Sequence, residues 1–268
     1  TLGSTNVILT DKTGTLTENK IYVDSFSFPE ENIKVTIEKN VLKYEKGNIE
    51  KSKNNFEKII LIGALCNNAA SKQDDGNKKL LGDPIEIALL YLADASGTTA
   101  NALKDTHERI SEMPFNSDTK VMGTLHKSKN GNFVAAKGSV EHLLEKCRRI
   151  IFDETLKELG DDDRKKIIAE SEKMAADGLR VLAFAYKEEN DTEKEDFLNN
   201  LIYAGMIGFL DPPRRDIKDA ILSCRRAGIK IVMITGDHPM TALNIAKKVG
   251  LADDADQHVI TGNDMPDM

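Results

Sequence analysis

The alternation of hydrophobic and polar positions separates the two ends of the chain from its middle. Near the N-terminus, the short apolar run Asn6 to Thr10 predicts a strand that leads directly into Asp11. Near the C-terminus, the continuous apolar run Ile229 to Ile234 predicts a second buried strand. The turn Thr235-Gly236-Asp237 follows that strand, so each of the two strands ends beside a carboxylate residue.

Helical periodicity surrounds the second strand. Before it, one helical face carries Ile217, Ala220, Ile221 and Cys224, and Gly228 closes that helix. After it, a helix begins near Pro239, carries Ala242, Ile245, Ala246 and Val249 on its inner face, and ends at Gly250. Strands that alternate with helices in this way predict a parallel sheet with helices on its faces.

The middle of the chain mixes short strands, polar turns and helices. Antiparallel hairpins are predicted at Phe26 to Tyr44 and at Val121 to Ala136. The predicted helices are Lys58 to Cys66, Pro84 to Ala95, Val140 to Arg149 and Asp161 to Asp177, and they are followed by a strand from Arg180 to Tyr186 and a polar loop from Lys187 to Asp196.

With 268 residues, the chain is long enough for two domains. We therefore predict an outer α/β domain from residues 1–19 and 211–268. An α+β domain built on an antiparallel sheet, residues 20–210, is inserted into it. The connections lie near Thr17 to Lys20 and near Leu210 to Pro213, where Asp211-Pro212-Pro213-Arg214 is a stiff segment.

Composition narrows the class of function. The net charge of −7 argues against a nucleic-acid surface, which usually carries a basic stripe. No apolar run approaches the roughly 20 residues that a membrane helix needs. The three cysteines, Cys66, Cys147 and Cys224, are widely spaced and lack the spacing of zinc ligands, which favours reduced thiols in a cytoplasmic protein.

The residues after the first strand suit phosphoryl transfer. Reactive groups lie at the carboxyl ends of the strands of a parallel sheet, so two strand ends bring Asp11, Thr235 and Asp237 to one edge. Asp11 can act as the nucleophile. Backbone amides around Thr13 to Thr15, with the Thr235 hydroxyl, can cradle the phosphate. The four residues Asp-Lys-Thr-Gly alone also occur in ordinary turns.

The complete stretch Asp11-Lys12-Thr13-Gly14-Thr15-Leu16-Thr17 resembles the signature of P-type ATPases, and the resemblance covers nearly the whole chain. It implies that Asp11 is phosphorylated, with Lys12 and Thr13 beside it, and that Mg²⁺ is held partly by Asp11 and the Thr13 carbonyl. It also implies that Thr235, Gly236 and Asp237 join this site. The segment from Asp211 to Arg214 becomes the hinge between the domains, with Arg214 among the nucleotide-binding residues.

One position distinguishes this family from phosphatases of the haloacid-dehalogenase type, whose fold the outer domain is expected to share. Those phosphatases carry a second aspartate two residues after the nucleophile, where it acts as the general acid. Thr13 occupies that position here, and a threonine cannot drive rapid hydrolysis of the acyl phosphate. A free-standing phosphatase remains the first alternative interpretation.

No GxxxxGK[ST] segment is present, so a Walker-type loop is excluded as the ATP site. The inserted domain offers Phe115 for stacking on adenine, and Lys120, Lys137 and Arg180 for the phosphates. Taken singly, a phenylalanine beside a proline usually belongs to the core, and a lone lysine is usually solvated surface.

The resemblance gives these residues roles. Phe115 matches the aromatic that stacks on adenine, Lys120 a lysine near the nucleotide, and Arg180 an arginine that reaches the phosphates. Lys137 and Gly138 match the Lys-Gly-Ala-Pro-Glu motif of the adenine pocket, although Ser139-Val140 replaces Ala-Pro, and Ser117 replaces an arginine. Glu86 matches a glutamate near the adenine amino group. Asp83, Pro84 and Glu86 also form a complete helix start, which is compatible with that role.

The resemblance implies an ATP- and Mg²⁺-dependent cation pump, of which this chain is a cytoplasmic part of an integral membrane protein. Its partners would be its own membrane helices and actuator domain, and the cation would not bind here. Gly178-Leu179-Arg180-Val181 and Gly236-Asp237-His238 look most like calcium-pump members.

The family's later Gly-Asp-Gly-x-Asn-Asp segment does not occur in this sequence. The chain is therefore expected to be a fragment with an incomplete phosphorylation domain, which binds nucleotide but turns it over slowly. A non-catalytic ATP-binding module is the second alternative.

Overall fold

The computed structural model describes residues 5–47, 49–74, 77–129, 131–152, 155–189, 197–236, 239–253 and 259–261. The chain divides into two compact units. The smaller unit comprises Thr1–Ile21, Lys173–Arg180 and Leu210–Met268, and the larger unit comprises Tyr22–Glu172 and Val181–Phe209. Residues 173–180, which the sequence analysis assigned to the inserted domain, group with the smaller unit. No helix in the described ranges has the length and apolar character to cross a membrane.

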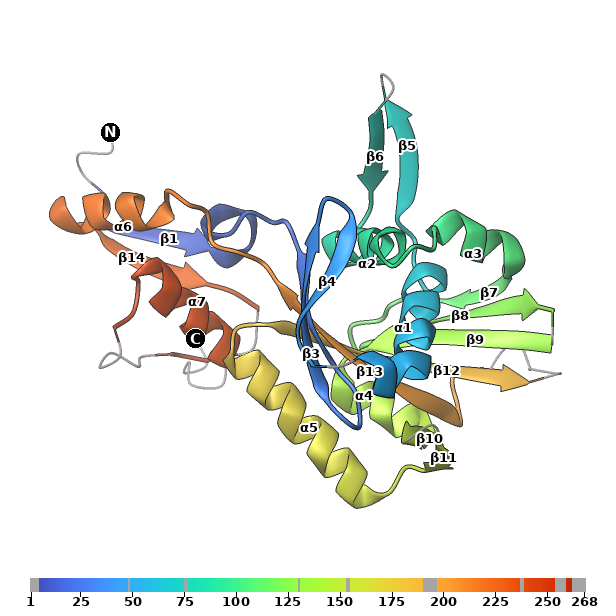
Figure 1. Ribbon diagram of the computed structural model, residues 1–268. Coiled ribbons are helices and arrows are strands. Elements are labelled where there is room, and N and C mark those ends of the chain that lie inside the picture. Colours follow the sequence, from blue (N-terminus) through green and yellow to red (C-terminus); the bar gives the residue numbers. More distant parts are fainter. Residues whose placement is uncertain are drawn as a thin grey trace. The chain divides into compact units, whose positions relative to one another are not determined.

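The larger unit is built on a ten-stranded sheet in which most neighbours are antiparallel (Figure 1). The main strand order is β4-β3-β2-β13-β12-β9-β8-β7, and β10 pairs with both β13 and β11. The strands are β2 (Tyr22–Ser27), β3 (Asn32–Glu38), β4 (Val41–Lys46), β7 (Glu108–Met113), β8 (Val121–Ser128), β9 (Gly131–Gly138), β10 (Cys147–Phe152), β11 (Thr155–Glu158), β12 (Arg180–Glu189) and β13 (Leu201–Leu210). The antiparallel pairings of β2 with β3, β3 with β4 and β8 with β9 confirm both predicted hairpins.

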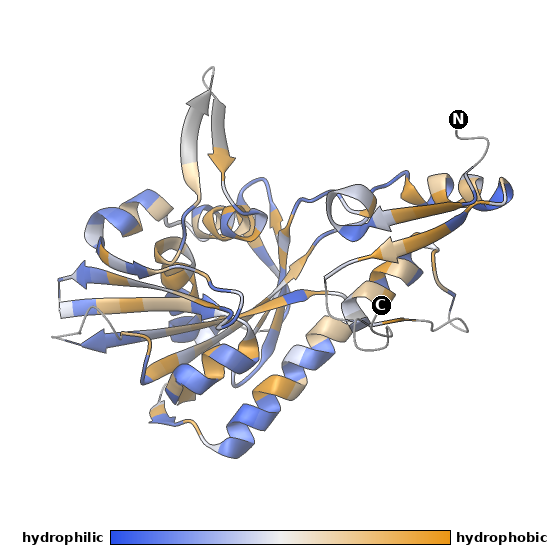
Figure 2. Ribbon diagram, turned by 180° about the vertical axis from the view of Figure 1, so that it is seen from behind, coloured by the Kyte–Doolittle hydropathy of each residue, from blue (hydrophilic) through white to orange (hydrophobic). Residues whose placement is uncertain are grey.

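The centre of this sheet is covered on both faces. Most residues of β8 and β9 are buried whichever way they point, and α1 and α4 both contact β9. A strand covered on both faces carries a continuous apolar run instead of alternating. Buried polar residues interrupt that run, namely Thr124 and His126 on β8 and Lys137 on β9. Figure 2 accordingly shows hydrophilic as well as hydrophobic stretches in the sheet.

The helices of the larger unit largely follow the local sequence signals. They are α1 (Lys53–Leu65), α2 (Pro84–Ala95), α3 (Ala100–Thr106), α4 (Val140–Lys146) and α5 (Asp161–Ala176), the last of which crosses the division between the units. A single turn, Ile49–Ser52, precedes α1, and the hairpin β5 (Ala70–Asp74) and β6 (Asn77–Leu81) follows it. The helices predicted from Pro84 and Asp161 are confirmed, and the helix predicted from Lys58 is present but begins earlier, at Lys53.

Two further predicted elements of this unit are wrong at one boundary. The helix predicted to reach Arg149 stops at Lys146, because Cys147 begins β10 and pairs in parallel with Leu201. The polar loop predicted from Lys187 begins later, because Lys187 to Glu189 extend β12 along β9. The rest of that loop, residues 190–196, lies outside the described residues.

The smaller unit contains a two-stranded parallel sheet of β1 (Val7–Asp11) and β14 (Lys230–Ile234), in register with Asp11 opposite Ile234. Helices α6 (Ile217–Arg226) and α7 (Pro239–Val249) supply its core. The buried side chains are Ile221, Ile245 and Val249, against which Ile217, Ile231, Met233 and Leu251 pack. The parallel pairing and both helices confirm the prediction for this part of the chain, but the two strands are not buried as predicted, because Val7, Leu9 and Ile234 are exposed. The fold is mixed α/β with one large, mainly antiparallel sheet and one small parallel sheet.

Candidate functional site

The first candidate site is the turn that follows β1. Asp11 ends the strand with an exposed side chain, and residues 12–16 form a tight coil. Within it, Thr13 is extended and Gly14 has a φ of +75°, a left-handed conformation that favours glycine. The coil leaves the side chains of Asp11 and Thr13 exposed while Lys12 is buried, so the carboxylate faces solvent at the sheet edge.

Thr17 holds this turn in place through hydrogen bonds. Its side chain is fully buried, and its hydroxyl donates to Asp211 Oδ2 at 2.7 Å. The Gly14 N–H donates to the Thr17 hydroxyl oxygen at 3.2 Å, and the Thr17 N–H donates to the Lys12 carbonyl at 3.1 Å. The other carboxylate oxygen of Asp211, Oδ1, is buried and has no hydrogen-bond partner in the described part of the chain. One hydroxyl therefore joins the Asp11 turn to the segment that begins at Asp211.

The segment from Asp211 to Arg214 lies against the turn as a short antiparallel pair, with Thr17 opposite Pro213. The Arg214 N–H donates to the Leu16 carbonyl at 2.9 Å, and its guanidinium donates to the Gly14 carbonyl at 3.0 Å. Arg214 was predicted to bind nucleotide, and the structure shows it bound to the Asp11 turn.

The parallel register brings the second strand end to the same edge. Ile234 lies opposite Asp11, so Thr235 and Gly236 follow at the carboxyl end of the sheet beside the Asp11 turn. Thr235 is half-buried and Gly236 is exposed, whereas Asp237 lies outside the described residues. The structure thus brings Asp11 and Thr235 to one sheet edge, as the strand-end argument predicted, and Lys12, Thr13 and Gly236 lie next to them in the chain.

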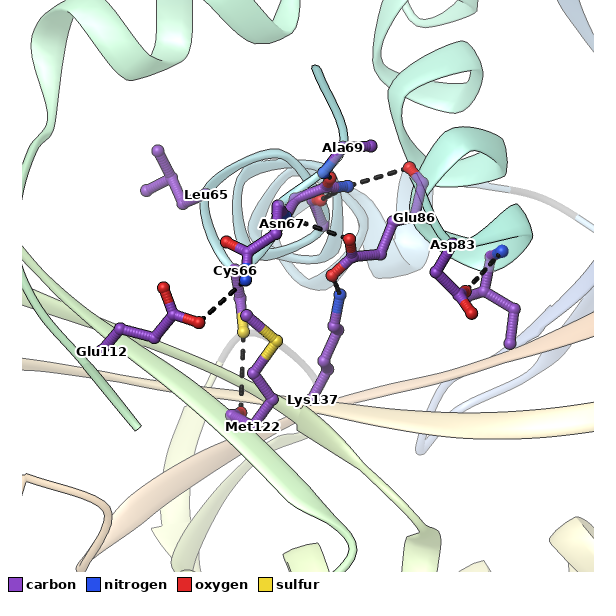
Figure 3. A network of polar contacts seen from close by, with 12 residues as sticks. Leu65, Cys66, Asn67, Ala69, Asp83, Glu86, Glu112, Met122 and Lys137 are labelled. Atoms are coloured by element: carbon purple, nitrogen blue, oxygen red, sulfur yellow. Dashed lines mark hydrogen bonds and ion pairs between the residues drawn. The ribbon is translucent and has the colours of Figure 1, made fainter. Parts of the chain in front are cut away.

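The second candidate site lies in the larger unit and centres on an ion pair between Glu86 and Lys137. The Lys137 ammonium, from β9, lies 2.7 Å from Glu86 Oε1, from the first turn of α2 (Figure 3). The side chains are only 8% and 12% exposed, so both charges are largely removed from water. The helix start places Glu86 here, because Asp83 Oδ1 accepts from the Ile85 N–H at 2.9 Å and Pro84 opens α2.

Gly138 and Lys120 meet directly beside this pair. A Cβ atom at Gly138 would lie 2.5 Å from the Lys120 carbonyl oxygen, so only glycine permits the observed approach. That carbonyl accepts from the Ser139 N–H at 3.0 Å, and Lys120 itself has a φ of +51°. Phe115, in the turn before β8, is 61% exposed, so it is a surface residue and not part of the core. Lys120, Lys137, Gly138 and Glu86 thus belong to one neighbourhood.

Arg180 belongs to a different unit from these residues. It is the exposed first residue of β12 and, like Arg214, belongs to the smaller unit. The larger unit therefore contributes Glu86, Phe115, Lys120, Lys137 and Gly138 of the predicted nucleotide residues.

A polar network that contacts Glu86 was not predicted. It consists of Asn67, Asn68, Arg109 and Glu112, which lie on the turn after α1 and on β7. No local motif marks these residues, because their contacts join segments that are distant in sequence.

A pocket of about 330 Å³ adjoins this network, and its lining residues are Asn67, Asn68, Ala69, Ala70, Lys104, His107, Arg109 and His126. Burial, followed by the charge of Arg109, lowers the pKa of Lys104. Burial also lowers the pKa of His126 to about 4. His126 Nδ1 lies 3.1 Å from the His107 carbonyl, which can only accept, so Nδ1 carries the proton and Nε2 accepts from Thr124 at 2.8 Å.

Comparison with known proteins finds a family model and several relatives that match this chain. Residues 55–216 match the family model described as P-type ATPase, cytoplasmic domain N. Calcium-transporting ATPase 1 of Bacillus cereus is 38% identical over 256 residues, which is 94% of this chain and 27% of that protein. Calcium-transporting ATPase 1 of Lactococcus lactis is 37% identical over 271 residues, which is 99% of this chain and 29% of that protein.

The sodium/potassium-transporting ATPase subunit alpha-A of Artemia franciscana is 33% identical over 280 residues, which is 97% of this chain and 28% of that protein. The chain thus spans less than a third of the length of these three relatives.

Proposed function

Because this chain belongs to the P-type ATPase family and contains its cytoplasmic domain N, we propose that it binds ATP and carries the aspartate phosphorylated during ATP-driven cation transport. In this proposal the smaller unit is part of a haloacid-dehalogenase-like phosphorylation domain, and the larger unit is the nucleotide-binding domain. The calcium-transporting relatives from Bacillus cereus and Lactococcus lactis support calcium as the transported cation of the whole protein.

The observation that carries the proposal is the desolvated Glu86–Lys137 pair in a unit that also exposes an aromatic ring, that of Phe115. Phe115 is an exposed ring on which a base can stack, and Lys120 is an exposed lysine that can bind phosphates. Lys137 uses one of its three N–H donors on Glu86, so it can also donate to a nucleotide. These residues satisfy the requirements of an adenine nucleotide: one stacking surface, a carboxylate acceptor and two cations.

The phosphoryl step follows from the position of Asp11. A carboxylate oxygen of Asp11 attacks the γ-phosphorus of ATP, and the new O–P bond forms as the bond to the β–γ bridging oxygen breaks. ADP leaves with that electron pair. Since Thr13 replaces a general acid, the acyl phosphate is hydrolysed slowly.

The donor chemistry of the Asp11 turn fits Mg²⁺. The Asp11 carboxylate and the Thr13 main-chain carbonyl are hard oxygen donors at the exposed strand end, and Mg²⁺ prefers oxygen ligands. When bound, the ion would offset the charge that builds up between the γ-phosphate and Asp11.

Titration calorimetry with ATP tests the binding half of the proposal. Lys137→Ala should weaken binding by about 1.5–3 kcal/mol, because it removes a charge-assisted contact. Lys127→Ala, at the opposite end of the same hairpin, is the matched control and should leave affinity unchanged. Equal affinity of Lys137→Ala and the unmodified chain for ATP would rule out Lys137 as an ATP-binding residue.

Acid-stable phosphoprotein after incubation with ATP and Mg²⁺ tests the catalytic half. We expect slow labelling that Asp11→Asn abolishes. Binding without any labelling, also in a longer chain that includes the rest of the phosphorylation domain, would instead identify a non-catalytic ATP-binding module.

A further inference from the structure

A β-bulge places Arg109 and Glu112 on the same face of the large sheet. In a regular strand, residues three apart point to opposite faces. The register of β7 against β8 shifts between Arg109 and Ser111, which leaves Ile110 as the extra residue. As a result, Arg109 pairs with His126 and Glu112 with Thr124, two positions that share a face, and Arg109 Nη1 donates to Glu112 Oε2 at 2.9 Å.

The pair Arg109–Glu112 clamps the turn that follows α1. Arg109 Nη2 donates to the carbonyls of Leu65 at 2.6 Å and Asn67 at 2.9 Å. Arg109 Nη1 also donates to Asn68 Oδ1 at 2.6 Å, and Asn68 Nδ2 donates to Glu112 Oε1 at 2.8 Å. The guanidinium therefore binds three successive parts of the turn, which a single-point ammonium could not do.

This turn after α1 also binds Glu86 at two points. The Asn68 main-chain N–H donates to Glu86 Oε2 at 3.1 Å, and Asn67 Nδ2 donates to the Glu86 main-chain carbonyl at 2.9 Å (Figure 3). Gly82 allows this approach, because a Cβ there would lie 2.7 Å from the Cβ of Ala69. Oε1 is then directed at Lys137, so the lysine is oriented by a chain of contacts that begins on β7.

We propose that Arg109 and Asn68 are positioning residues of the nucleotide site, which fix the Glu86 carboxylate and, through it, the Lys137 ammonium. This inference rests on the proposed ATP site and deepens it. A site whose charged groups are held in place before binding loses less conformational entropy when the ligand arrives. The clamp therefore acts on affinity and on selection of the base, not on the phosphoryl step.

Asn68→Ala is the central test, because Asn68 is exposed and its removal spares the core. We expect the Kd for ATP, measured by titration calorimetry, to rise about fivefold to tenfold, as for the loss of one or two hydrogen bonds. Arg109→Met should have at least as large an effect. Asn101→Ala, which replaces an exposed asparagine on α3, is the matched control and should leave the Kd unchanged.

A double-mutant cycle separates positioning from general structural damage. If Asn68 acts through Glu86, then Asn68→Ala in the Glu86→Gln background should change the Kd by less than about twofold. An undiminished effect in that background would overturn the inference, as would an unchanged Kd in both Asn68→Ala and Arg109→Met while Lys137→Ala still weakens binding. Absence of ATP binding by the unmodified chain would overturn the proposed function itself.

Discussion

The buried Glu86–Lys137 pair should reveal itself in the stability of the larger unit. Lys137→Met keeps the length of the side chain and removes its charge. It leaves Glu86, whose side chain is 12% exposed in the unmodified chain, with the Asn68 N–H as a donor to its carboxylate. Breaking a buried ion pair by removing one partner costs about 3–5 kcal/mol. Because Glu86 retains some contact with water, we expect a loss of about 3 kcal/mol, the lower end of that range.

Glu86→Gln should be milder. The amide carbonyl can still accept from the Asn68 N–H or from Lys137, but the ammonium loses its counter-charge, and the expected loss is about 2 kcal/mol. Combining Glu86→Gln with Lys137→Met removes both charges together. The double variant should then lie within about 1 kcal/mol of the unmodified chain, which corresponds to a coupling free energy on the order of 4–5 kcal/mol.

Urea unfolding followed by far-ultraviolet circular dichroism measures these differences. The chain contains no tryptophan, so fluorescence offers a weaker signal. Lys127→Met, on the same hairpin, is the control for an exposed lysine. A loss below about 1 kcal/mol in Lys137→Met would refute the reasoning, because the two charges would then be solvated or unpaired. Additive losses in the double variant would refute it as well.

Two further predictions concern other buried groups. Because burial lowers the pKa of His126 from 6.5 to about 4, the unfolded chain binds a proton in this interval that the folded chain does not. Stability should be full above pH 6.5 and fall by up to about 3 kcal/mol toward pH 4 in urea unfolding, and His126→Gln should flatten this dependence. Thr17→Val keeps the side-chain volume but strips Asp211 of its hydroxyl donor. It should lower the protection of the Gly14 amide against hydrogen exchange by about 1–3 kcal/mol, whereas Thr17→Ser should largely preserve that protection.

The fold of the smaller unit could be predicted because its signals are local. The apolar run before Thr235 and the helical face ending at Gly250 identify a strand and a helix on their own. Parallel pairing with the strand before Asp11 then follows from the strand–helix order. The start of α2 was predicted to the residue for the same reason, since Asp83 and Pro84 cap the helix through their own contacts.

The errors in the larger unit arose where a distant segment decides the local structure. Cys147 to Arg149 continue a helical pattern, but they extend as a strand because Leu201 to Tyr203 offer them a parallel partner. The strand that contains the bulge at Ile110 has no glycine or proline from which the bulge could be predicted. Consequently the clamp formed by Arg109 and Glu112 could not be predicted, although resemblance to the family had identified Glu86 and Lys137.

The geometry of Glu86 bears on how a base could enter the proposed site. An ionised carboxylate accepts about four hydrogen bonds, and here two donors are identified, Lys137 at Oε1 and the Asn68 N–H at Oε2. A base amino group can therefore be added to the pair without displacing either donor. The charges of Glu86 and Lys137 stay neutralised throughout binding, so the penalty of separating a buried pair does not arise. What binding requires instead is that the remaining acceptor positions face the incoming base, and the clamp on β7 determines that orientation.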